Sequence, residues 1–185
     1  VFGEVVRAQG AYIHNLEPFW DHYWKNGEND KLGWRLEYNM KHRGDVYATH
    51  GLGPVAQALD IHRGDRMKTL VAMDTKSVVG KSLVEERTGQ PCENFRNGDH
   101  TTTLIRTENG KVIEIQHDVM TPQPYNRLYQ LTGTKGFANK YPIEGYALDA
   151  KQLNASGVAP EVDNLNSHSF MPKKDMEALV QKYQH

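Results

Sequence analysis

A dense group of polar and aromatic residues occupies positions 34 to 54, before and at the start of an expected helix. Arg35, Tyr47, Thr49 and His50 are its side chains that could bind a ligand or exchange protons. A helix N-terminus presents free backbone N–H groups, which favour a polar or anionic ligand. His50, with Tyr47 three residues earlier, could transfer protons near neutral pH. The same histidine could instead cap or pack the helix, and spacing alone does not separate these roles.

Other patterns that carry chemistry do not occur in the sequence. The chain has nine histidines and one cysteine, Cys92, and none of them follows the spacing of a zinc site. No G-x-S-x-G run is present, and Gly51-Leu-Gly53 lacks the rest of a dinucleotide-binding fingerprint. The residues therefore predict neither a metal site, nor a hydrolase triad, nor a Rossmann loop.

Aromatic residues are concentrated between Leu16 and Trp34, a segment typical of a loop or a short helical lobe. Their flat apolar faces could stack on a sugar ring, although core packing is the usual role of such side chains. The residues concerned are Phe19, Trp20, Tyr23, Trp24 and Trp34.

Composition limits the class of protein. The chain has 185 residues, of which 38% are hydrophobic, and its 22 Lys and Arg balance 23 Asp and Glu. This length is enough for one large or two small domains with a hydrophobic core. The lack of excess positive charge argues against a nucleic-acid-binding role. No apolar run approaches the roughly 18 residues of a membrane span.

A helix is expected to follow the group around His50. Its apolar positions are Leu52, Val55, Ala56 and Leu59. These recur at helical spacing. Gly51, Gly53 and Pro54 are tolerable only in the first turn of such a helix, so we place its start there, with Thr49 as the N-cap.

Strands are expected at residues 4–14, 68–74 and 125–132. The clearest local signal is a hairpin, in which the alternating runs 101–107 and 111–118 flank Asn109-Gly110. This dipeptide predicts a type I′ turn with positive φ at both central positions. Two further segments are a polar surface excursion over 150–169 and a helix over 173–185. The order of the elements predicts an α+β domain with a mostly antiparallel sheet.

Several longer runs resemble glycoside hydrolase family 109. They are Trp34-Arg-Leu36, Gly44-Asp-Val-Tyr-Ala-Thr-His-Gly-Leu-Gly-Pro54, Asp60-Ile-His-Arg-Gly-Asp65, Gln116-His-Asp-Val-Met-Thr-Pro-Gln-Pro-Tyr-Asn-Arg127 and Gly133-Thr-Lys-Gly136. Members of this family are NAD-dependent α-N-acetylgalactosaminidases related to the superfamily of glucose-fructose oxidoreductase and inositol dehydrogenase. The first residues, Val1–Val6 with Gly10–His14, are similar to the first strand of that superfamily's C-terminal domain.

The resemblance implies a fold and a domain organisation. Family members begin with a Rossmann domain that binds most of the NAD, and this domain is expected to be absent from the chain. Residues 1–185 would then be a single C-terminal domain fragment that carries the substrate-binding and catalytic face. The implied fold is α+β, with an open, mostly antiparallel sheet and helices on one face.

The reaction that the resemblance implies does not use the carboxylate pair of most glycosidases. NAD⁺ removes a hydride from C3 of the sugar, the leaving group at C1 is eliminated, water adds, and the hydride returns. Such chemistry needs groups that move protons to and from the sugar, and donors that hold the ring near the nicotinamide. The isolated chain is expected to be inactive, because the cofactor would be bound mainly by the N-terminal domain.

The resemblance also assigns roles to residues of this chain. It implies that the substrate is contacted by Tyr12, Arg35, Tyr47, Ala48, Thr49, His50 and Tyr125. Tyr47 is also implied to touch NAD. His50 would be the main proton-transfer residue, assisted by Tyr47 or Tyr12.

Structural roles stay open for three of these residues. Tyr12 could belong to the core, because it lies in an apolar alternation. Tyr125 could merely anchor a turn. Arg35 could pair with Glu37 on the surface.

Two other functions remain open. The complete protein could be an NAD(P)-dependent sugar oxidoreductase, because most of the superfamily releases a keto product. The chain by itself could be a non-catalytic module for substrate binding and dimerisation. The expected partners are a small carbohydrate and a second copy of the chain, paired through the sheet face, with neither nucleic acid nor membrane. The compartment is undecided, although relatives are often exported by bacteria.

Overall fold

The computed structural model describes residues 1–28, 31–149 and 168–183. In chain order the elements are β1 (Val5–Ile13), the 3-10 helices η1 (Glu17–Tyr23) and η2 (Lys25–Gly27), α1 (Trp34–Lys41), α2 (Ala48–Ala58), β2 (Met67–Asp74), α3 (Val79–Thr88), β3 (His100–Thr107), β4 (Val112–Asp118), β5 (Tyr129–Gly133), β6 (Gly136–Asn139), β7 (Gly145–Leu148), β8 (Met171–Pro172), the 3-10 helix η4 (Lys173–Met176) and α5 (Glu177–Tyr183). Within the described ranges, none of the helices combines the length and apolar character needed to cross a membrane.

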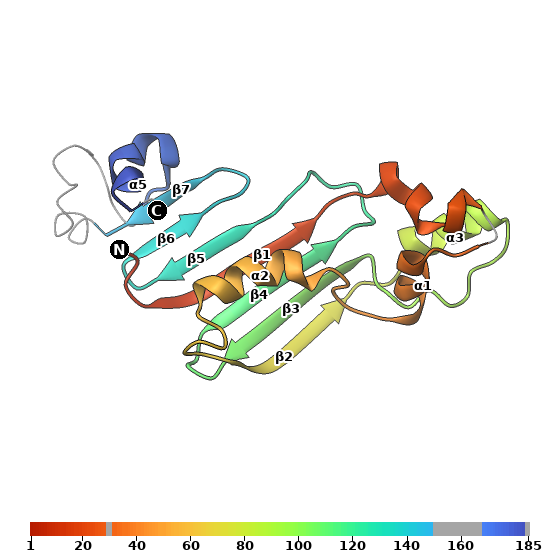
Figure 1. The fold of residues 1–185 in the computed structure, drawn as a ribbon, viewed down its shortest axis with the longest axis horizontal. Helices are drawn as coiled ribbons and strands as arrows, with labels where there is room; N and C mark the ends of the chain where they lie inside the picture. The colour runs from red at the N-terminus through yellow and green to blue at the C-terminus, as the bar shows by residue number, and fades with distance from the viewer. Residues whose placement is uncertain (29–30, 150–167, 184–185) are drawn as a thin grey trace.

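The strands form one eight-stranded sheet in the order β2-β3-β4-β1-β5-β6-β7-β8 (Figure 1). β1 pairs in parallel with β4, and every other neighbouring pair is antiparallel. The sheet is open, with β2 and β8 at its edges, and α2 lies across one face over β1 and β4 (Figure 1). The predicted α+β class with an open, mostly antiparallel sheet is therefore confirmed.

The main core lies between α2 and the sheet. Val55 of α2 and Leu59, the C-cap of this helix, are buried against Ala8, Ile113 and Ile115. Ala8 lies opposite Ile113 in the register of β1 and β4, so their side chains share one face of the sheet. Alternation along each strand thus gives α2 an apolar surface to cover.

Two glycines set the distance between α2 and β1. A Cβ added at Gly10 would lie 2.2 Å from the carbonyl oxygen of Gly51. Because the obstacle is backbone, a side chain at position 10 would force the helix away from the strand. This close approach brings His50, the neighbour of Gly51, against Tyr12 of β1.

The aromatic segment forms a lobe beyond one end of the sheet, where η1, α1 and α3 lie together (Figure 1). Tyr23 and Trp24 are buried in a second core cluster with Tyr12 and Leu36. Phe19, in contrast, is 50% exposed. Of the two predicted forms, a loop or a short helical lobe, the structure has the helical lobe, and only part of its aromatic surface is used for packing.

The start of α2 differs from the prediction. The helix begins at Ala48 with Tyr47 as its N-cap, so Thr49 is not the cap and Pro54 lies beyond the first turn. The backbone N–H of Tyr47 donates to Oδ1 of Asp45 at 2.9 Å. This bond fixes the chain before the helix and allows it to start ahead of the glycines.

The hairpin of β3 and β4 is in the predicted place, but its turn is not type I′. Gly110 has a φ of +84°, whereas Asn109 is not among the residues with positive φ. The loop is closed by the N–H of Thr107, which donates to the carbonyl of Lys111 at 2.9 Å. Asn109 donates its own N–H to Oδ1 of Asp65 at 3.1 Å. This contact with a neighbouring loop holds Asn109 in an ordinary conformation.

Two other predicted segments differ in extent, and a third lies mostly outside the described ranges. β5 begins at Tyr129 rather than at residue 125, because the preceding segment forms only an isolated bridge with β1, between Asn126 and Ile13. One further bond joins them, in which the carbonyl of Leu128 accepts the N–H of Ala11 at 3.0 Å. The predicted C-terminal helix is divided into η4 and α5, and residues 184–185 lie outside the described ranges. Of the predicted surface excursion, residues 150–167 also lie outside them.

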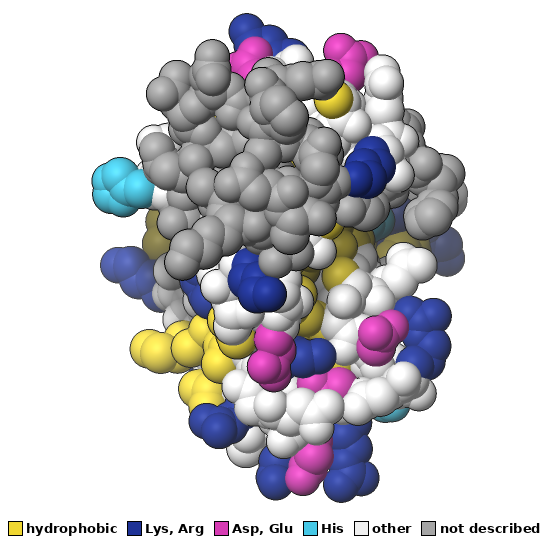
Figure 2. Space-filling model, turned by 90° about the vertical axis from the view of Figure 1, so that its left-hand side faces the viewer, with side chains coloured by type: hydrophobic (Ala, Val, Ile, Leu, Met, Phe, Trp, Pro, Cys, Tyr) yellow, Lys and Arg dark blue, Asp and Glu magenta, His cyan; other side chains and the backbone are white. Residues whose placement is uncertain are grey.

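The sheet face opposite α2 is part polar and part apolar. Arg7 pairs with Glu114 at 2.5 Å, and Gln9 donates to the same carboxylate at 2.9 Å. Toward the β2 edge, this face exposes Val71, Met73 and Leu104. In Figure 2, hydrophobic side chains gather toward one lower edge of the molecule. Val71, Met73 and Leu104 are therefore neighbours on one face, whereas other exposed apolar side chains, such as Phe19 and Ile143, lie elsewhere.

Candidate functional site

A cavity of about 310 Å³ lies where β1, η1, α1 and the start of α2 meet. It is lined by Tyr12, His14, Leu16, Phe19, His22, Tyr23, Arg35, Tyr47 and His50. Four of the residues predicted to contact substrate are among them, namely Tyr12, Arg35, Tyr47 and His50. They come from three different elements, so the fold brings them together.

Tyr12 lies at the centre of this site. The ring of His50 stacks on it, with centroids 4.4 Å apart and planes inclined by 28°. Tyr47 meets Tyr12 edge-on at 5.5 Å, and the guanidinium carbon of Arg127 lies 4.3 Å from the Tyr12 centroid. With 8% of its surface exposed, Tyr12 belongs to the core and to the cavity wall at once.

The surroundings of His50 and Tyr12 favour proton exchange. Partial burial and the positive charge of Arg127 lower the pKa of His50. Its imidazole is therefore neutral at pH 7 and can accept a proton. Burial raises the pKa of Tyr12, although the Arg127 charge opposes this. The Tyr12 hydroxyl accordingly stays protonated and can donate a hydrogen bond.

Arg35 offers its guanidinium to the cavity. Glu37 pairs with Lys41 and not with Arg35. The Cζ atom of Arg35 lies 4.4 Å from the centroid of the Trp34 ring. Across the described residues, no carboxylate lies within ion-pair distance of Arg35. Its N–H groups can therefore bind hydroxyl or carbonyl oxygens.

The other predicted substrate contacts lie beside the cavity. The ring of Tyr125 is 5.0 Å from that of His14 and is 45% exposed, which places it at the rim. Ala48 and Thr49 form the first turn of α2 and do not line the cavity.

A buried carboxylate holds the turn that carries Tyr125. Oδ1 of Asp118 accepts the N–H of Thr121 at 2.9 Å, and Oδ2 accepts Nε2 of Gln123 at 2.6 Å. Burial alone would raise the pKa of Asp118, but hydrogen bonds, chiefly from His100 and Thr121, outweigh it and lower the pKa. The carboxylate therefore stays ionised and keeps the turn in place.

Several residues of the site were not predicted to line it, although Phe19 and Tyr23 were among the aromatic residues that could stack on a sugar ring. His14, Leu16, Phe19, His22 and Tyr23 line the cavity, and Arg127, Asp45 and His117 contact residues that line it. The aromatic composition of residues 16–24 is visible in the sequence, but not that this segment folds over the end of β1. Among the described residues, no three His, Cys, Asp or Glu side chains are grouped to hold a metal ion.

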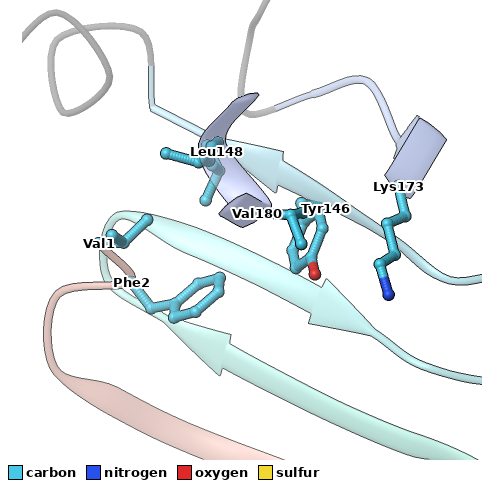
Figure 3. A pocket seen from close by; sticks show the side chains of 7 residues that line it. Val1, Phe2, Tyr146, Leu148, Lys173 and Val180 are labelled. Atoms are coloured by element: carbon cyan, nitrogen blue, oxygen red, sulfur yellow. The ribbon is translucent and has the colours of Figure 1, made fainter. Parts of the chain in front are cut away.

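A second cavity, of about 350 Å³, lies at the other end of the sheet (Figure 3). It is lined by Val1, Phe2, Tyr146, Leu148, Lys173, Leu179 and Val180. Its walls are apolar apart from Lys173 and the Tyr146 hydroxyl, and Lys173 pairs with Glu144 at 3.1 Å. This second cavity lacks a histidine beside a tyrosine. The first cavity is therefore the candidate active site.

The sequence matches one protein family along its whole length. A family model described as the C-terminal domain of glycosyl hydrolase 109 matches residues 1–185. The chain belongs to glycosyl hydrolase family 109. A glycosyl hydrolase family 109 protein of Phocaeicola vulgatus is 84% identical over 185 residues, and one of Porphyromonas gingivalis is 57% identical. These matches cover 100% of the chain but 36% and 38% of the two relatives, so the chain spans about a third of their length.

Solved structures share the fold of this family 109 domain. An inositol dehydrogenase homologue from Azotobacter vinelandii, complexed with NAD⁺, matches with a TM-score of 0.53 and 14% identity, over 80% of this chain and 35% of its own. A levoglucosan dehydrogenase, in complex with NADH and L-sorbose, matches with a TM-score of 0.51 and 16% identity, over 92% of this chain and 40% of its own. The domain thus has the C-terminal fold of this group of dehydrogenases.

Proposed function

We propose that the chain forms the substrate-binding side of the active site in an NAD-dependent α-N-acetylgalactosaminidase. One observation carries this proposal: His50, Tyr12, Tyr47 and Arg35 line the same cavity. Membership of family 109 supports action on a glycoside. The chain covers about a third of its relatives, and we propose that the remainder includes an N-terminal Rossmann domain.

The chain supplies only part of the proposed NAD site. Tyr47 lines the site cavity and also a smaller one, of about 140 Å³, beside Trp34 and Tyr38. It would contact the nicotinamide end of the cofactor from there. The sequence lacks a glycine-rich dinucleotide-binding fingerprint, so we place the contact with the diphosphate in the Rossmann domain. When bound, NAD⁺ would supply the hydride acceptor and donor for C3 of the sugar.

The residues of this chain would bind the sugar and move its protons. His50 would accept a proton from the sugar, assisted by Tyr47 or Tyr12. Arg35 would hold a hydroxyl or carbonyl oxygen. The backbone N–H groups of Ala48 and Thr49, in the first turn of α2, have no partner within the helix and could donate to the substrate. Tyr125 would contact the sugar at the rim.

Substituting His50 tests the proposal in the full-length protein that contains this chain. His50→Ala should lower the rate of hydrolysis of an aryl α-N-acetylgalactosaminide by about 100-fold or more, because general acid–base catalysis contributes at least that much. His62→Asn is the matched control, since His62 is exposed and its φ of +66° is tolerated by asparagine. An unchanged rate for His50→Ala would refute the catalytic role.

A cofactor measurement separates this proposal from an NAD(P)-dependent sugar dehydrogenase. The proposed glycosidase should release sugar with no net accumulation of reduced NAD. Reduced cofactor that accumulates in equal amount to product would identify a dehydrogenase instead. Calorimetry on the isolated chain tests whether the NAD site lies mainly outside it. NAD binding to this chain with ordinary dehydrogenase affinity would contradict that proposal.

We also propose that two copies of the chain pair through the sheet face opposite α2. The exposed apolar group of Val71, Met73 and Leu104 supports this, because grouped apolar side chains often mark interaction surfaces. The polar network around Glu114 lies on the same face and would add directional contacts.

A further inference from the structure

A buried histidine and a buried carboxylate lie behind the wall of the site cavity. His117, on β4, is 2% exposed, and the side chain of Asp45, in the loop before α2, is 8% exposed. Nε2 of His117 lies 3.8 Å from Oδ1 of Asp45. Neither residue lines the cavity, and both are enclosed by this chain alone. Both side chains are therefore buried within this chain.

The pair leaves several polar atoms without partners. Within the described part of the chain, both ring nitrogens of His117, Oδ2 of Asp45 and Oγ1 of Thr101 accept or donate no hydrogen bond. Thr101 is opposite His117 in the register of β3 and β4, so the two share one face. An unpartnered buried polar group costs about 1 to 3 kcal/mol, so apolar residues here would give a more stable core. The arrangement points to a role other than packing.

The pair contacts two of the three tyrosines that line the cavity, Tyr12 and Tyr47. The ring centroid of His117 lies 5.7 Å from that of Tyr47 and 6.1 Å from that of Tyr12. Oδ1 of Asp45 accepts the backbone N–H of Tyr47 at 2.9 Å. The two tyrosines are thus supported from behind by a histidine ring, and one of them is also held by a carboxylate.

Burial determines the charge of the pair. It raises the pKa of Asp45 to about 6, opposed by the N–H of Tyr47, and it lowers the pKa of His117 to about 4. Above pH 6 the pair therefore holds one negative charge, on Asp45, beside a neutral imidazole. The other titratable groups that face the pair are Asp118 on β4, His100 on β3, His50 on α2, Tyr12 on β1 and Tyr47 at the start of α2.

We propose that His117 and Asp45 are positioning residues for the proton transfers at His50 and Tyr47, an inference that rests on the proposed function. Asp45 fixes the backbone at the start of α2, and His117 supports the rings of Tyr47 and Tyr12. The carboxylate places a negative charge behind the groups that exchange protons with the sugar.

Three variants of the full-length protein test the two parts of this role. Asp45→Asn removes the charge but keeps an oxygen that can accept the N–H of Tyr47, whereas Asp45→Ala removes both. His117→Phe keeps a ring of similar shape without its nitrogens. Asp60→Asn is the matched control, because Asp60 is exposed and its φ of +55° suits asparagine. Circular dichroism and thermal unfolding verify that each variant is folded.

Asp45→Asn should lower kcat at least tenfold with KM within about twofold, and it should remove a step near pH 6 from the pH profile of kcat. Asp45→Ala should in addition raise KM, because Tyr47 loses its backbone anchor. His117→Phe should lower kcat as Asp45→Asn does. Wild-type kcat and an unchanged pH profile in both Asp45→Asn and His117→Phe would overturn the proposal.

NMR of histidine-labelled protein keeps this test separate from the proposed function. The ring signals of His117 should shift with a midpoint near pH 6 as Asp45 ionises, and this step should vanish in Asp45→Asn but persist in Asp60→Asn. A step that persists in Asp45→Asn would overturn the pair whether or not the protein hydrolyses glycosides. If the step vanishes in Asp45→Asn but the wild-type protein has no glycosidase activity, the proposed function is overturned and the contact between Asp45 and His117 is supported.

Discussion

His50 and His117 both contact the ring of Tyr12, yet only His50 is exposed to solvent. A histidine that exchanges protons with a substrate needs access to the cavity, which His50 has. His117 is enclosed and stays neutral, because burial lowers its pKa to about 4. His50 is therefore suited to proton exchange with a substrate, whereas the buried His117 is suited to supporting the Tyr12 ring.

Asp45 and His117 should change the free energy of unfolding in opposite directions as the pH changes. The pKa of Asp45 is raised from 3.8 to about 6, so its contribution is full below pH 3.8 and is lost as the pH rises through 6. The pKa of His117 is lowered from 6.5 to about 4, so its contribution is full above pH 6.5 and is lost as the pH falls through 4.

Asp45→Asn should therefore gain stability relative to the wild type as the pH rises from 4 to 7, by up to about 3 kcal/mol. His117→Phe should gain relative stability as the pH falls from 6.5 to 4, to a similar extent. Denaturant unfolding of this chain at several pH values measures both. Curves parallel to the wild type over this range would contradict the pKa assignments.

At the scale of elements, the site depends on how α2 crosses β1. Gly10 and Gly51 allow the backbones to approach, and this approach carries His50 onto Tyr12. The register of β1 and β4 places Tyr12 opposite His117 on the face that α2 covers. The helix and two parallel strands therefore position the rings on both sides of the cavity wall.

Gly10→Ala should destabilise the chain, because the new Cβ would lie 2.2 Å from a backbone oxygen that cannot rotate away. We expect a loss of about 1 to 3 kcal/mol, the range for overpacked cores. Gly53→Ala is the matched control, since its Cβ would meet nothing nearer than a Thr49 methyl at 3.9 Å. It should be neutral or gain up to about 1 kcal/mol of helix propensity. Equal unfolding midpoints for the two variants in denaturant would show that the crossing is not tight.

At the scale of the whole molecule, the two faces of the sheet differ in how they are covered. α2 covers one face, and the opposite face leaves Val71 and Met73 of β2 exposed by 64% and 75%. Leu70, on the same strand, is 60% exposed but lies on the face of α2, because it is opposite Ile105 in the register. β2 therefore carries an exposed apolar residue on each face, Val71 for a test substitution and Leu70 for its control.

Val71→Asp should weaken self-association through the face opposite α2, because it would bury a charge in an apolar interface. Leu70→Asp places the same charge on the other face and should leave the oligomeric state unchanged. Sedimentation velocity over a range of protein concentrations distinguishes dimer from monomer. A wild-type protein that stays monomeric, or a loss of dimer in both variants, would contradict the proposed pairing.

Much of the fold could be predicted from local patterns. The alternation of residues 4–14 and the Asn109-Gly110 dipeptide located β1 and the β3–β4 hairpin, because strand pairing across a short loop is a local property. The conformation of that turn could not be predicted, since Asp65, distant in sequence, holds Asn109. Helices α1 and α3 and the short strands β6 to β8 were also missed, because their patterns are brief and weak.

By itself, the sequence determined the α+β class, the family and four residues that line the cavity, because periodicity and motifs are local properties of the sequence. Only the tertiary structure decided that His14, Phe19 and His22 complete the wall, and that Asp45 meets His117 behind it. These contacts depend on β4 lying beside β1 and on the two glycines that let α2 cross β1 closely. Such approaches between distant segments follow from packing, which no local pattern encodes.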